Sequence, residues 1–70
     1  MSLRVAKLLQ QERERKGMSM TRLAQDAGLS QQMVSYVERG LRNPTLDTLL
    51  RISDVLEIDL SEIIRKASKR

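Results

Sequence analysis

Residues 18–40 read MSMTRLAQDAGLSQQMVSYVERG, and the fold can be predicted from the helix signals in these residues. Ser19 and Ser30 are residues of the type that begins helices, because a serine hydroxyl accepts a hydrogen bond from a backbone N–H of the first turn. Gly28 and Gly40 are placed to end helices, since glycine readily adopts the left-handed backbone conformation found there. The pattern therefore predicts two short helices joined by a sharp turn at Gly28, the arrangement called a helix-turn-helix.

The second helix of this pair has two chemically different faces. Within the helix-turn-helix predicted at residues 19–39, Val34 and Val37 point inward at helical spacing, and Glu38 lies on the same side. Ala24 is the small residue expected where the two helices cross closely. The outward face has hydrogen-bonding groups and no carboxylate, and it is formed by Gln31, Gln32, Ser35, Tyr36 and Arg39.

The rest of the chain is also predicted to be helical. A first helix is expected over residues 3–16, although Glu12 interrupts its apolar stripe. A fourth follows the loop that ends at Pro44 and runs to about Glu57, with one apolar face formed by Leu46, Leu49, Ile52, Ser53 and Leu56. Asp59 has the spacing of a helix cap for a last helix. Since alternation of the kind seen in strands is missing, an all-α domain of five helices is predicted.

Composition restricts the classes of protein to which this chain can belong. Its 70 residues are enough for one domain over residues 1–70, and its 40% hydrophobic and 31% charged residues are typical of a globular protein. Cysteine and histidine are absent, which excludes disulfides and thiolate or imidazole metal sites. No apolar run is long enough to span a membrane, and no secretory signal is visible. A cytoplasmic protein is therefore expected.

Charge is distributed unevenly along the sequence, with a formal net charge of +4. Residues 1–42 carry eight basic and four acidic side chains, whereas residues 43–64 carry one basic and five acidic. The basic tail, residues 66–70, is a candidate for disorder. Such a distribution suits a polyanionic partner on one face of the molecule, and it also fits an ordinary solvated surface.

Two adjacent glutamines favour the first of these interpretations. A glutamine amide can donate to N7 and accept from N6 of adenine, and Gln31 and Gln32 begin the helix that would enter the major groove. Taken singly, each is more often a solvated helix residue. Placed on the outward face of a helix-turn-helix, the pair indicates that the chain reads double-stranded DNA.

The stretch quoted above resembles the lambda-repressor-like (phage repressor or XRE-type) helix-turn-helix family, which includes restriction-modification controllers and many bacterial regulators. The resemblance extends over about residues 5–64. Its most specific positions are Leu23-Ala24, Gly28, Val34-Ser35, Val37 through Gly40, Arg42-Asn43-Pro44 and Leu56.

This resemblance implies a compact five-helix fold, a homodimer on a palindromic operator and no enzymatic activity. It assigns base reading in the major groove to Gln31, Gln32, Ser35 and Tyr36. Phosphate contacts are expected from Ser19, Thr21, Ser30, Arg39, Arg42 and Asn43. Arg13 and Glu38 match a partly buried ion pair that links the first helix to the third.

The chain departs from the family pattern at two positions. Many relatives have a glutamine at the start of the second helix, where its amide helps to hold a phosphate, and this chain has Met20. Thr21 or the helix N-terminus could substitute for that contact. Many relatives also have an apolar residue in place of Glu12, so looser packing of the first helix is expected.

Apolar residues in excess of those needed for a core suggest a partner subunit. Leu50 and Val55 lie off the core stripe of the fourth helix, and Ile64 adds to Leu60 on the last helix. We expect some of these four to form a two-fold interface. The alternative is that they are isolated surface apolar residues, which are common.

Other functional classes are less well supported by the sequence. A protein-interaction module, such as an antitoxin whose main partner is a toxin, would keep the helix-turn-helix but bind most tightly to another protein. Binding to DNA without sequence preference would be better served by scattered lysines than by a glutamine pair. Neither a metal, a cofactor nor a small-molecule ligand is indicated, and an enzyme is not expected, since the chain has no pattern of catalytic residues.

Overall fold

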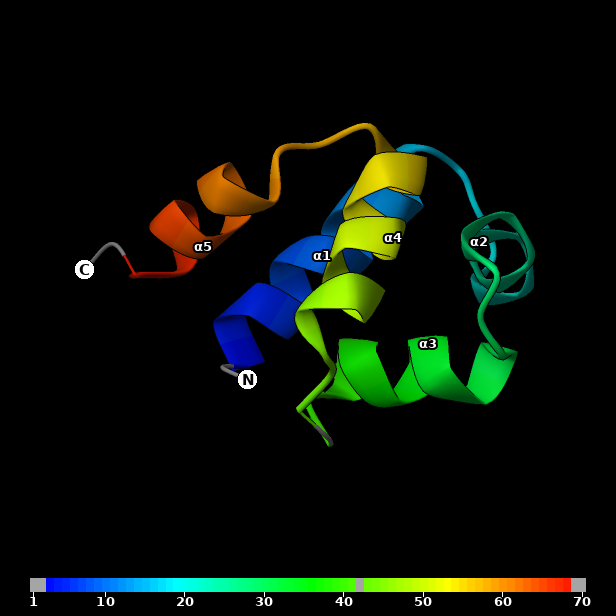
Figure 1. The fold of residues 1–70 in the computed structure, drawn as a ribbon. Helices are drawn as coiled ribbons and strands as arrows, with labels where there is room; N and C mark the ends of the chain where they lie inside the picture. Colours follow the sequence, from blue (N-terminus) through cyan, green and yellow to red (C-terminus); the bar gives the residue numbers. More distant parts are fainter. Residues whose placement is uncertain (1–2, 42, 69–70) are drawn as a thin grey trace.

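A computed structural model describes residues 3–41 and 43–68 of the chain. Within these ranges the chain forms five helices, which confirms the predicted all-α fold. Their bounds are α1 Leu3–Arg15, α2 Met20–Ala27, α3 Gln31–Arg39, α4 Leu46–Leu56 and α5 Leu60–Ser68. Figure 1 shows α3 along the bottom of the molecule with no helix below it, and α2 and α5 at opposite ends.

The predicted helix boundaries in the helix-turn-helix are confirmed. The Ser19 hydroxyl accepts a hydrogen bond from the Arg22 backbone N–H at 3.0 Å, and Ser30 does the same for Met33 at 3.0 Å. Gly28 has a φ of 70°, in the left-handed region, and its backbone N–H bonds to carbonyls at the end of α2. Because only residues 28–30 separate the two helices and Gly28 turns the chain sharply, α3 begins directly beside α2.

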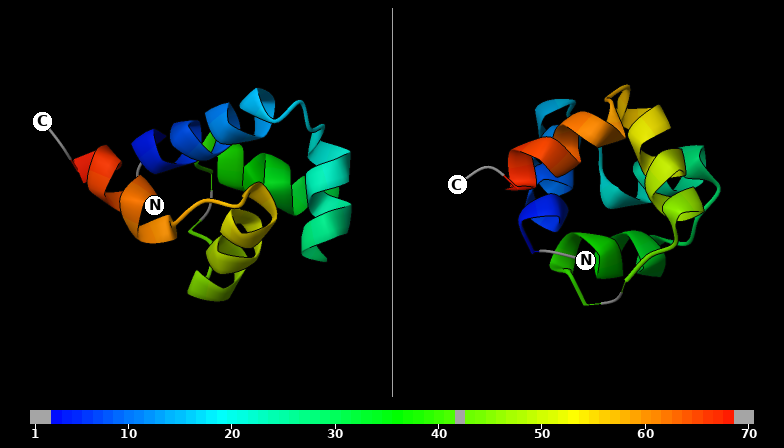
Figure 2. Two further views of the ribbon diagram at one scale, coloured as in Figure 1. Left: turned by 90° about the horizontal axis from the view of Figure 1, so that it is seen from above. Right: turned by 60° about the vertical axis from the view of Figure 1, so that its left-hand side comes forward.

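The core lies between α1, α2, the inner side of α3 and α4. α3 packs against α2 and α1, α2 also packs against α4, and α5 packs against α1 and α4 (Figure 2). The largest apolar side chains that are almost completely shielded from solvent come from the first four helices: Leu9, Leu23, Val34, Val37, Ile52 and Leu56. Since α3 is fixed from two sides, its outward face is held in one orientation.

The periodicity of the fourth helix gives one wrong assignment. Leu46 was expected on the core face of α4, and its side chain is 64% exposed. It is the first residue of the helix, and helical side chains lean toward the N-terminus, so Leu46 extends past the end of the packed region. Ile52, Ser53 and Leu56 on the same face are buried as predicted.

The C-terminal helix begins at the predicted cap. The carboxylate of Asp59 accepts hydrogen bonds from the backbone N–H and the hydroxyl of Ser61, at 2.9 and 2.7 Å. α5 then continues to Ser68, and the last part of the basic tail, residues 69–70, lies outside the described ranges. None of the helices in the described part of the chain has the length and apolar character needed to cross a membrane.

Candidate nucleic-acid interface

The inner face of α3 fixes the helix to the core. Val34 and Val37 are buried against neighbouring helices, and Glu38, one residue further on, is buried with them. These are the three residues predicted to point inward. Because residues on the opposite side of the same helix must then face away from the core, the burial of these three orients the candidate reading face.

The outer face of α3 has the polar composition predicted from the sequence. Gln31, Gln32 and Arg39 are exposed, while Ser35 and Tyr36 are half-buried. The Gln32 Nε2 donates a hydrogen bond to the Tyr36 hydroxyl at 2.6 Å. Glu38, the one carboxylate in α3, is on the inner side. The outer face therefore offers amide and hydroxyl groups and a guanidinium, without an anion that would repel phosphate.

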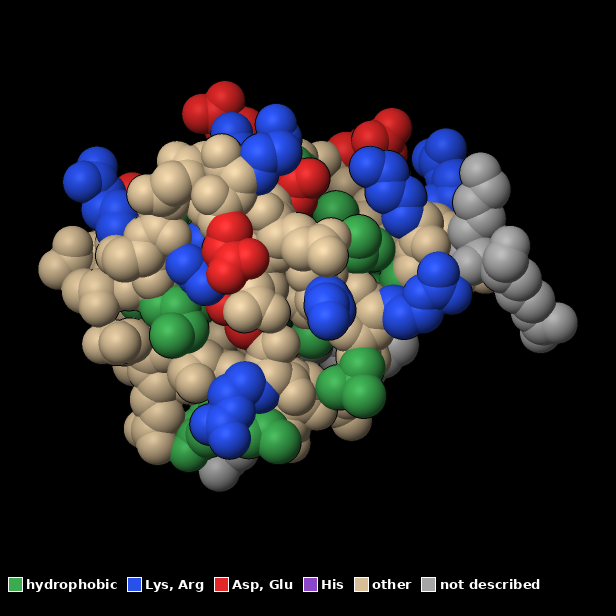
Figure 3. Space-filling model, turned by 180° about the vertical axis from the view of Figure 1, so that it is seen from behind, with side chains coloured by type: hydrophobic (Ala, Val, Ile, Leu, Met, Phe, Trp, Pro, Cys, Tyr) green, Lys and Arg blue, Asp and Glu red, His purple; other side chains and the backbone are tan. Residues whose placement is uncertain are grey.

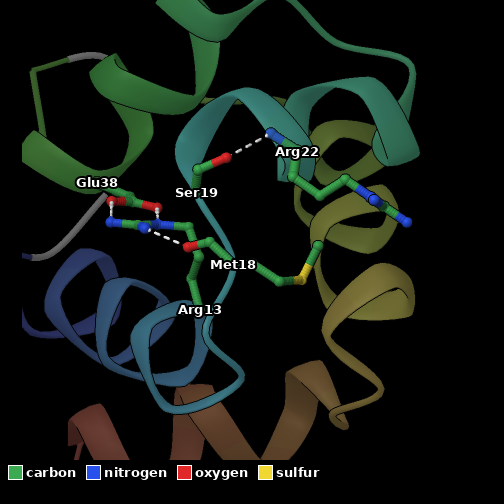
Figure 4. Close-up of polar contacts among 5 residues, drawn as sticks. All are labelled: Arg13, Met18, Ser19, Arg22 and Glu38. Atoms are coloured by element: carbon green, nitrogen blue, oxygen red, sulfur yellow. Dashed lines mark hydrogen bonds and ion pairs between the residues drawn. The ribbon is translucent and has the colours of Figure 1, made fainter.

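Arg13 of α1 and Glu38 of α3 form the buried ion pair that the resemblance implies (Figure 4). Arg13 Nε and Nη2 donate to the two carboxylate oxygens of Glu38 at 2.7 and 3.1 Å. A third hydrogen bond runs from Nη1 to the backbone carbonyl of Met18 at 2.6 Å. One guanidinium thus joins α1, α3 and the loop that leads into α2.

The pair also affects the ionisation of Arg13. The hydrogen bond with Glu38 raises the pKa of the Arg13 guanidinium above its ordinary value, although partial burial acts in the opposite direction. Arg13 is therefore charged at every pH at which the protein would be studied. A permanently charged guanidinium in a buried position needs its carboxylate partner.

The candidate phosphate contacts are spread over the edges of this surface. Ser19 and Ser30 cap α2 and α3, and since each hydroxyl uses a lone pair for the cap, its O–H remains a possible donor. Thr21, Arg39 and Asn43 are exposed. Arg42, also predicted to contact phosphate, lies outside the described residues.

The structure adds a polar group that the sequence reasoning did not name. Thr45 caps α4, accepting a hydrogen bond from the Thr48 backbone N–H at 3.2 Å. Both threonines line a small hollow between α3 and the start of α4, together with Met33, Val37, Asn43 and Pro44. A threonine directly before an apolar helical stretch is the usual signal for a cap, and it was present in the sequence.

Met20, the departure from the family pattern, is the first residue of α2 and is half-buried. Its side chain packs against the hydrophobic core. A thioether has no hydrogen to donate, so this side chain can supply no hydrogen bond to a phosphate. Any phosphate contact at the start of α2 must come from backbone N–H groups or from neighbouring hydroxyls.

The four residues predicted for a dimer interface fall into two groups. Leu50 and Ile64 are 44% and 46% exposed, and both line a groove between α4 and α5. Leu60 lies on the side of α5 that packs against the rest of the chain and is only 7% exposed. It therefore belongs to the core of the single chain. Val55 is half-buried and packs against the core, so it offers little free surface.

Charged side chains are unevenly placed on the surface. Figure 3 shows lysine and arginine side chains gathered on the right of that view, toward the C-terminal end, while much of the lower left has few charges. Arg4, Lys7 and Lys66 lie together around one hollow of the α1–α5 surface. Within residues 3–41 and 43–68, no group of three or more acidic side chains could hold a metal ion.

Comparison with known proteins agrees with this geometry. The family model described as helix-turn-helix matches residues 9–63. The chain belongs to the lambda-repressor-like helix-turn-helix family. It is 35% identical over 60 residues to the HTH-type transcriptional regulator SlrR of Bacillus subtilis, which covers 84% of this chain and 40% of SlrR. The chain thus spans less than half the length of that relative.

Two solved structures with similar sequences have the same fold. The restriction-modification controller protein C.AhdI from Aeromonas hydrophila is 34% identical, with a TM-score of 0.83 over 87% of this chain and 92% of that one. SinR, a master regulator for biofilm formation, was solved in complex with DNA. It is 31% identical, with a TM-score of 0.80 over 86% of this chain and 97% of that chain.

Proposed function

We propose that this chain is a sequence-specific DNA-binding regulator that inserts α3 into the major groove. The observation that carries the proposal is the outer face of α3, where Gln31 and Gln32 are exposed beside Ser35 and Tyr36 while Glu38 is buried. Glutamine amides recognise adenine edges through paired hydrogen bonds. The similarity to SinR, whose structure was solved with DNA, supports the same partner for this chain.

Phosphate contacts at both ends of α3 would hold this helix in the groove. Ser30 lies at its N-terminus, and Arg39 and Asn43 lie at and after its C-terminus. Phosphate contacts set the register of a protein on DNA, whereas base contacts give the sequence preference. In this proposal Ser19 and Thr21 contact the DNA backbone from the start of α2, and Arg42, three residues after Arg39 in the sequence, adds a further phosphate contact.

We further propose that two copies bind a palindromic operator. The exposed Leu50 and Ile64 line one groove between α4 and α5, which gives an apolar surface for a second copy. A domain of 70 residues buries a modest core, and a dimer would stabilise it by burying more apolar surface. Two-fold symmetry would place the two recognition helices about 34 Å apart, one turn of B-DNA.

The decisive experiment measures sequence preference and salt dependence together. The protein selects from a pool of duplexes whose random centre is about two helical turns long, and the selected duplex is compared with a scrambled one. A regulator should prefer the selected duplex by a factor of about a thousand or more, with affinity falling as salt rises. Binding that falls with salt without any preference would contradict the proposal.

Substitution of the two glutamines tests the assignment of the reading face. Gln31→Ala with Gln32→Ala should remove most of the sequence preference and leave most of the salt dependence, because neither side chain is charged. Gln11→Ala is the matched control, an exposed glutamine on α1 that lines the α1–α5 surface. Normal preference in the double variant would show that other residues read the bases.

A further inference from the structure

The hydrogen bond between Gln32 and Tyr36 gives these two residues unequal roles on the reading face. They are four positions apart on α3, so their side chains lie one above the other on the same side of the helix. The bond runs from the Gln32 Nε2 to the Tyr36 hydroxyl at 2.6 Å. Within the described ranges no such bond joins Gln31 to Ser35, the equivalent pair one residue earlier.

The tyrosine is the more rigid member of the pair. Its ring is half-buried, whereas Gln32 is exposed and has more rotatable bonds. A hydroxyl on a packed ring therefore stands at a nearly constant place, and the glutamine amide that binds to it loses much of its freedom. The amide is therefore already ordered in the free protein, and DNA binding costs less conformational entropy at this side chain.

The bond also changes which base edge the amide can recognise. A glutamine side chain has two N–H hydrogens and one carbonyl oxygen. Gln32 donates one Nε2 hydrogen to the Tyr36 hydroxyl. The other Nε2 hydrogen and the carbonyl Oε1 can still form both hydrogen bonds with adenine, which presents N7 as acceptor and N6 as donor. Guanine presents two acceptors, N7 and O6, and a tethered amide has only one hydrogen left to give them.

On the basis of the proposed function, we infer that Tyr36 is a positioning residue that restricts Gln32 to adenine. It acts through the orientation of the Gln32 amide and needs no contact with a base. Gln31, which lacks this tether, reads its own base pair independently of Tyr36. The inference thus separates two adjacent glutamines that are chemically identical in the sequence.

The variant Tyr36→Phe tests this role because it keeps the ring and removes only the hydroxyl. With the randomised duplex pool, base preferences are measured at each position for the wild type, Gln31→Ala, Gln32→Ala, Tyr36→Phe and the variant that combines Gln32→Ala with Tyr36→Phe. Tyr36→Phe should lower the adenine-to-guanine preference about threefold to tenfold at the position that Gln32→Ala affects. This change is smaller than the loss of a complete bidentate contact between a side chain and a base would cause. Preference at the position affected by Gln31→Ala should not change.

The variant that combines Gln32→Ala with Tyr36→Phe distinguishes a positioning role of Tyr36 from a direct contact between Tyr36 and a base. With alanine at position 32, adding Tyr36→Phe should have no further effect, since no amide remains to be oriented. Unchanged preferences in Tyr36→Phe would overturn the inference, and so would a loss at a position that Gln32→Ala does not affect. A wild-type protein without any base preference would instead overturn the proposed function itself, and this inference with it.

A measurement without DNA gives a second readout. In the free protein, the side-chain amide hydrogens of Gln32 should show an NMR chemical shift and slowed water exchange typical of a hydrogen-bonded amide. Tyr36→Phe should return both values to those of Gln31, while thermal unfolding shows that the variant is folded. Identical Gln32 signals in the wild type and the variant would mean that the tether is not formed in solution.

Discussion

Arg13 and Glu38 are 25 residues apart in the sequence, yet their side chains meet through two hydrogen bonds of 2.7 and 3.1 Å. The same guanidinium holds the carbonyl of Met18 in the loop before α2. The orientation of α3 therefore depends on a side chain of α1 as well as on apolar packing. This arrangement makes the candidate reading face sensitive to a change at a residue that would touch no DNA.

Removing one partner of this pair should destabilise the domain strongly. Glu38→Ala leaves the Arg13 guanidinium charged and buried, and we expect a loss of about 3–5 kcal/mol in the free energy of unfolding. Urea unfolding followed by circular dichroism measures it. Arg22→Ala is the control, because its ion pair with Asp26 is exposed and screened by solvent, so its loss should have a much smaller effect. Equal effects of the two substitutions would contradict the structural role of Arg13 and Glu38.

A left-handed residue that is not glycine ends α4. Glu57 has a φ of 57°, in the region that glycine adopts with least strain. We expect Glu57→Gly to raise the free energy of unfolding by about 1 kcal/mol. Gly40→Ala should act in the opposite direction, since Gly40 has a φ of 67°, a conformation that is strained for any residue with a Cβ. Thermal unfolding of both variants checks the signs.

The cap of α5 should depend on pH. Hydrogen bonds from Ser61, first from its hydroxyl and then from its backbone N–H, lower the pKa of Asp59 below its usual value of about 3.9. The folded state therefore prefers the ionised carboxylate, and the stabilisation by this cap is present above pH ~4 and is lost as pH falls through the lowered pKa. NMR titration of the Asp59 carboxylate measures the value directly.

A single substitution separates the sources of this shift. Ser61→Ala removes the hydroxyl and keeps the backbone donor, so the pKa of Asp59 should rise part of the way toward its usual value. Thermal unfolding of both proteins checks that Ser61→Ala is folded. An unchanged pKa of Asp59 in Ser61→Ala would mean that the hydroxyl bond is not populated in solution.

The proposed dimer makes a prediction that separates Ile64 from Leu60. Leu50→Glu with Ile64→Glu should give a folded monomer by sedimentation, because both side chains are exposed in the single chain. Leu60→Ala should instead destabilise the chain by about 2–5 kcal/mol, since Leu60 is buried. A wild-type protein that is monomeric at tens of micromolar and on its selected duplex would exclude the interface.

The contribution of Arg39 to binding should be electrostatic. Arg39→Ala should weaken binding to selected and scrambled duplexes by similar factors, and lower the slope of log affinity against log salt by about 1. Lys66→Ala is the control, because Lys66 lies on α5, which packs against α1 and α4 and contributes no residue to the proposed DNA surface. A loss of sequence preference in Arg39→Ala would assign this residue to base reading instead.

The local structure of the chain could be predicted from sequence. Ser19 and Ser30 begin their helices, and Gly28 ends α2 in the left-handed conformation, as their positions indicate. The inward face of α3 also followed from spacing, because Val34 and Val37 must share one side of a helix. Such features depend on backbone conformation within a few residues, so the sequence alone determined the helix-turn-helix and the face of α3 that carries Gln31 and Gln32.

How these elements meet depends on contacts between helices that are far apart in the sequence. Helical periodicity placed Leu46 in the core and kept Leu60 with Ile64 among the candidate interface residues, whereas the packed chain exposes Leu46 and buries Leu60. The contact of Arg13 with Met18 was not visible in the sequence, although the family pattern implied its pairing with Glu38. Burial and long-range contacts depend on how helices end and cross, and a pattern within one helix contains no information about its neighbours.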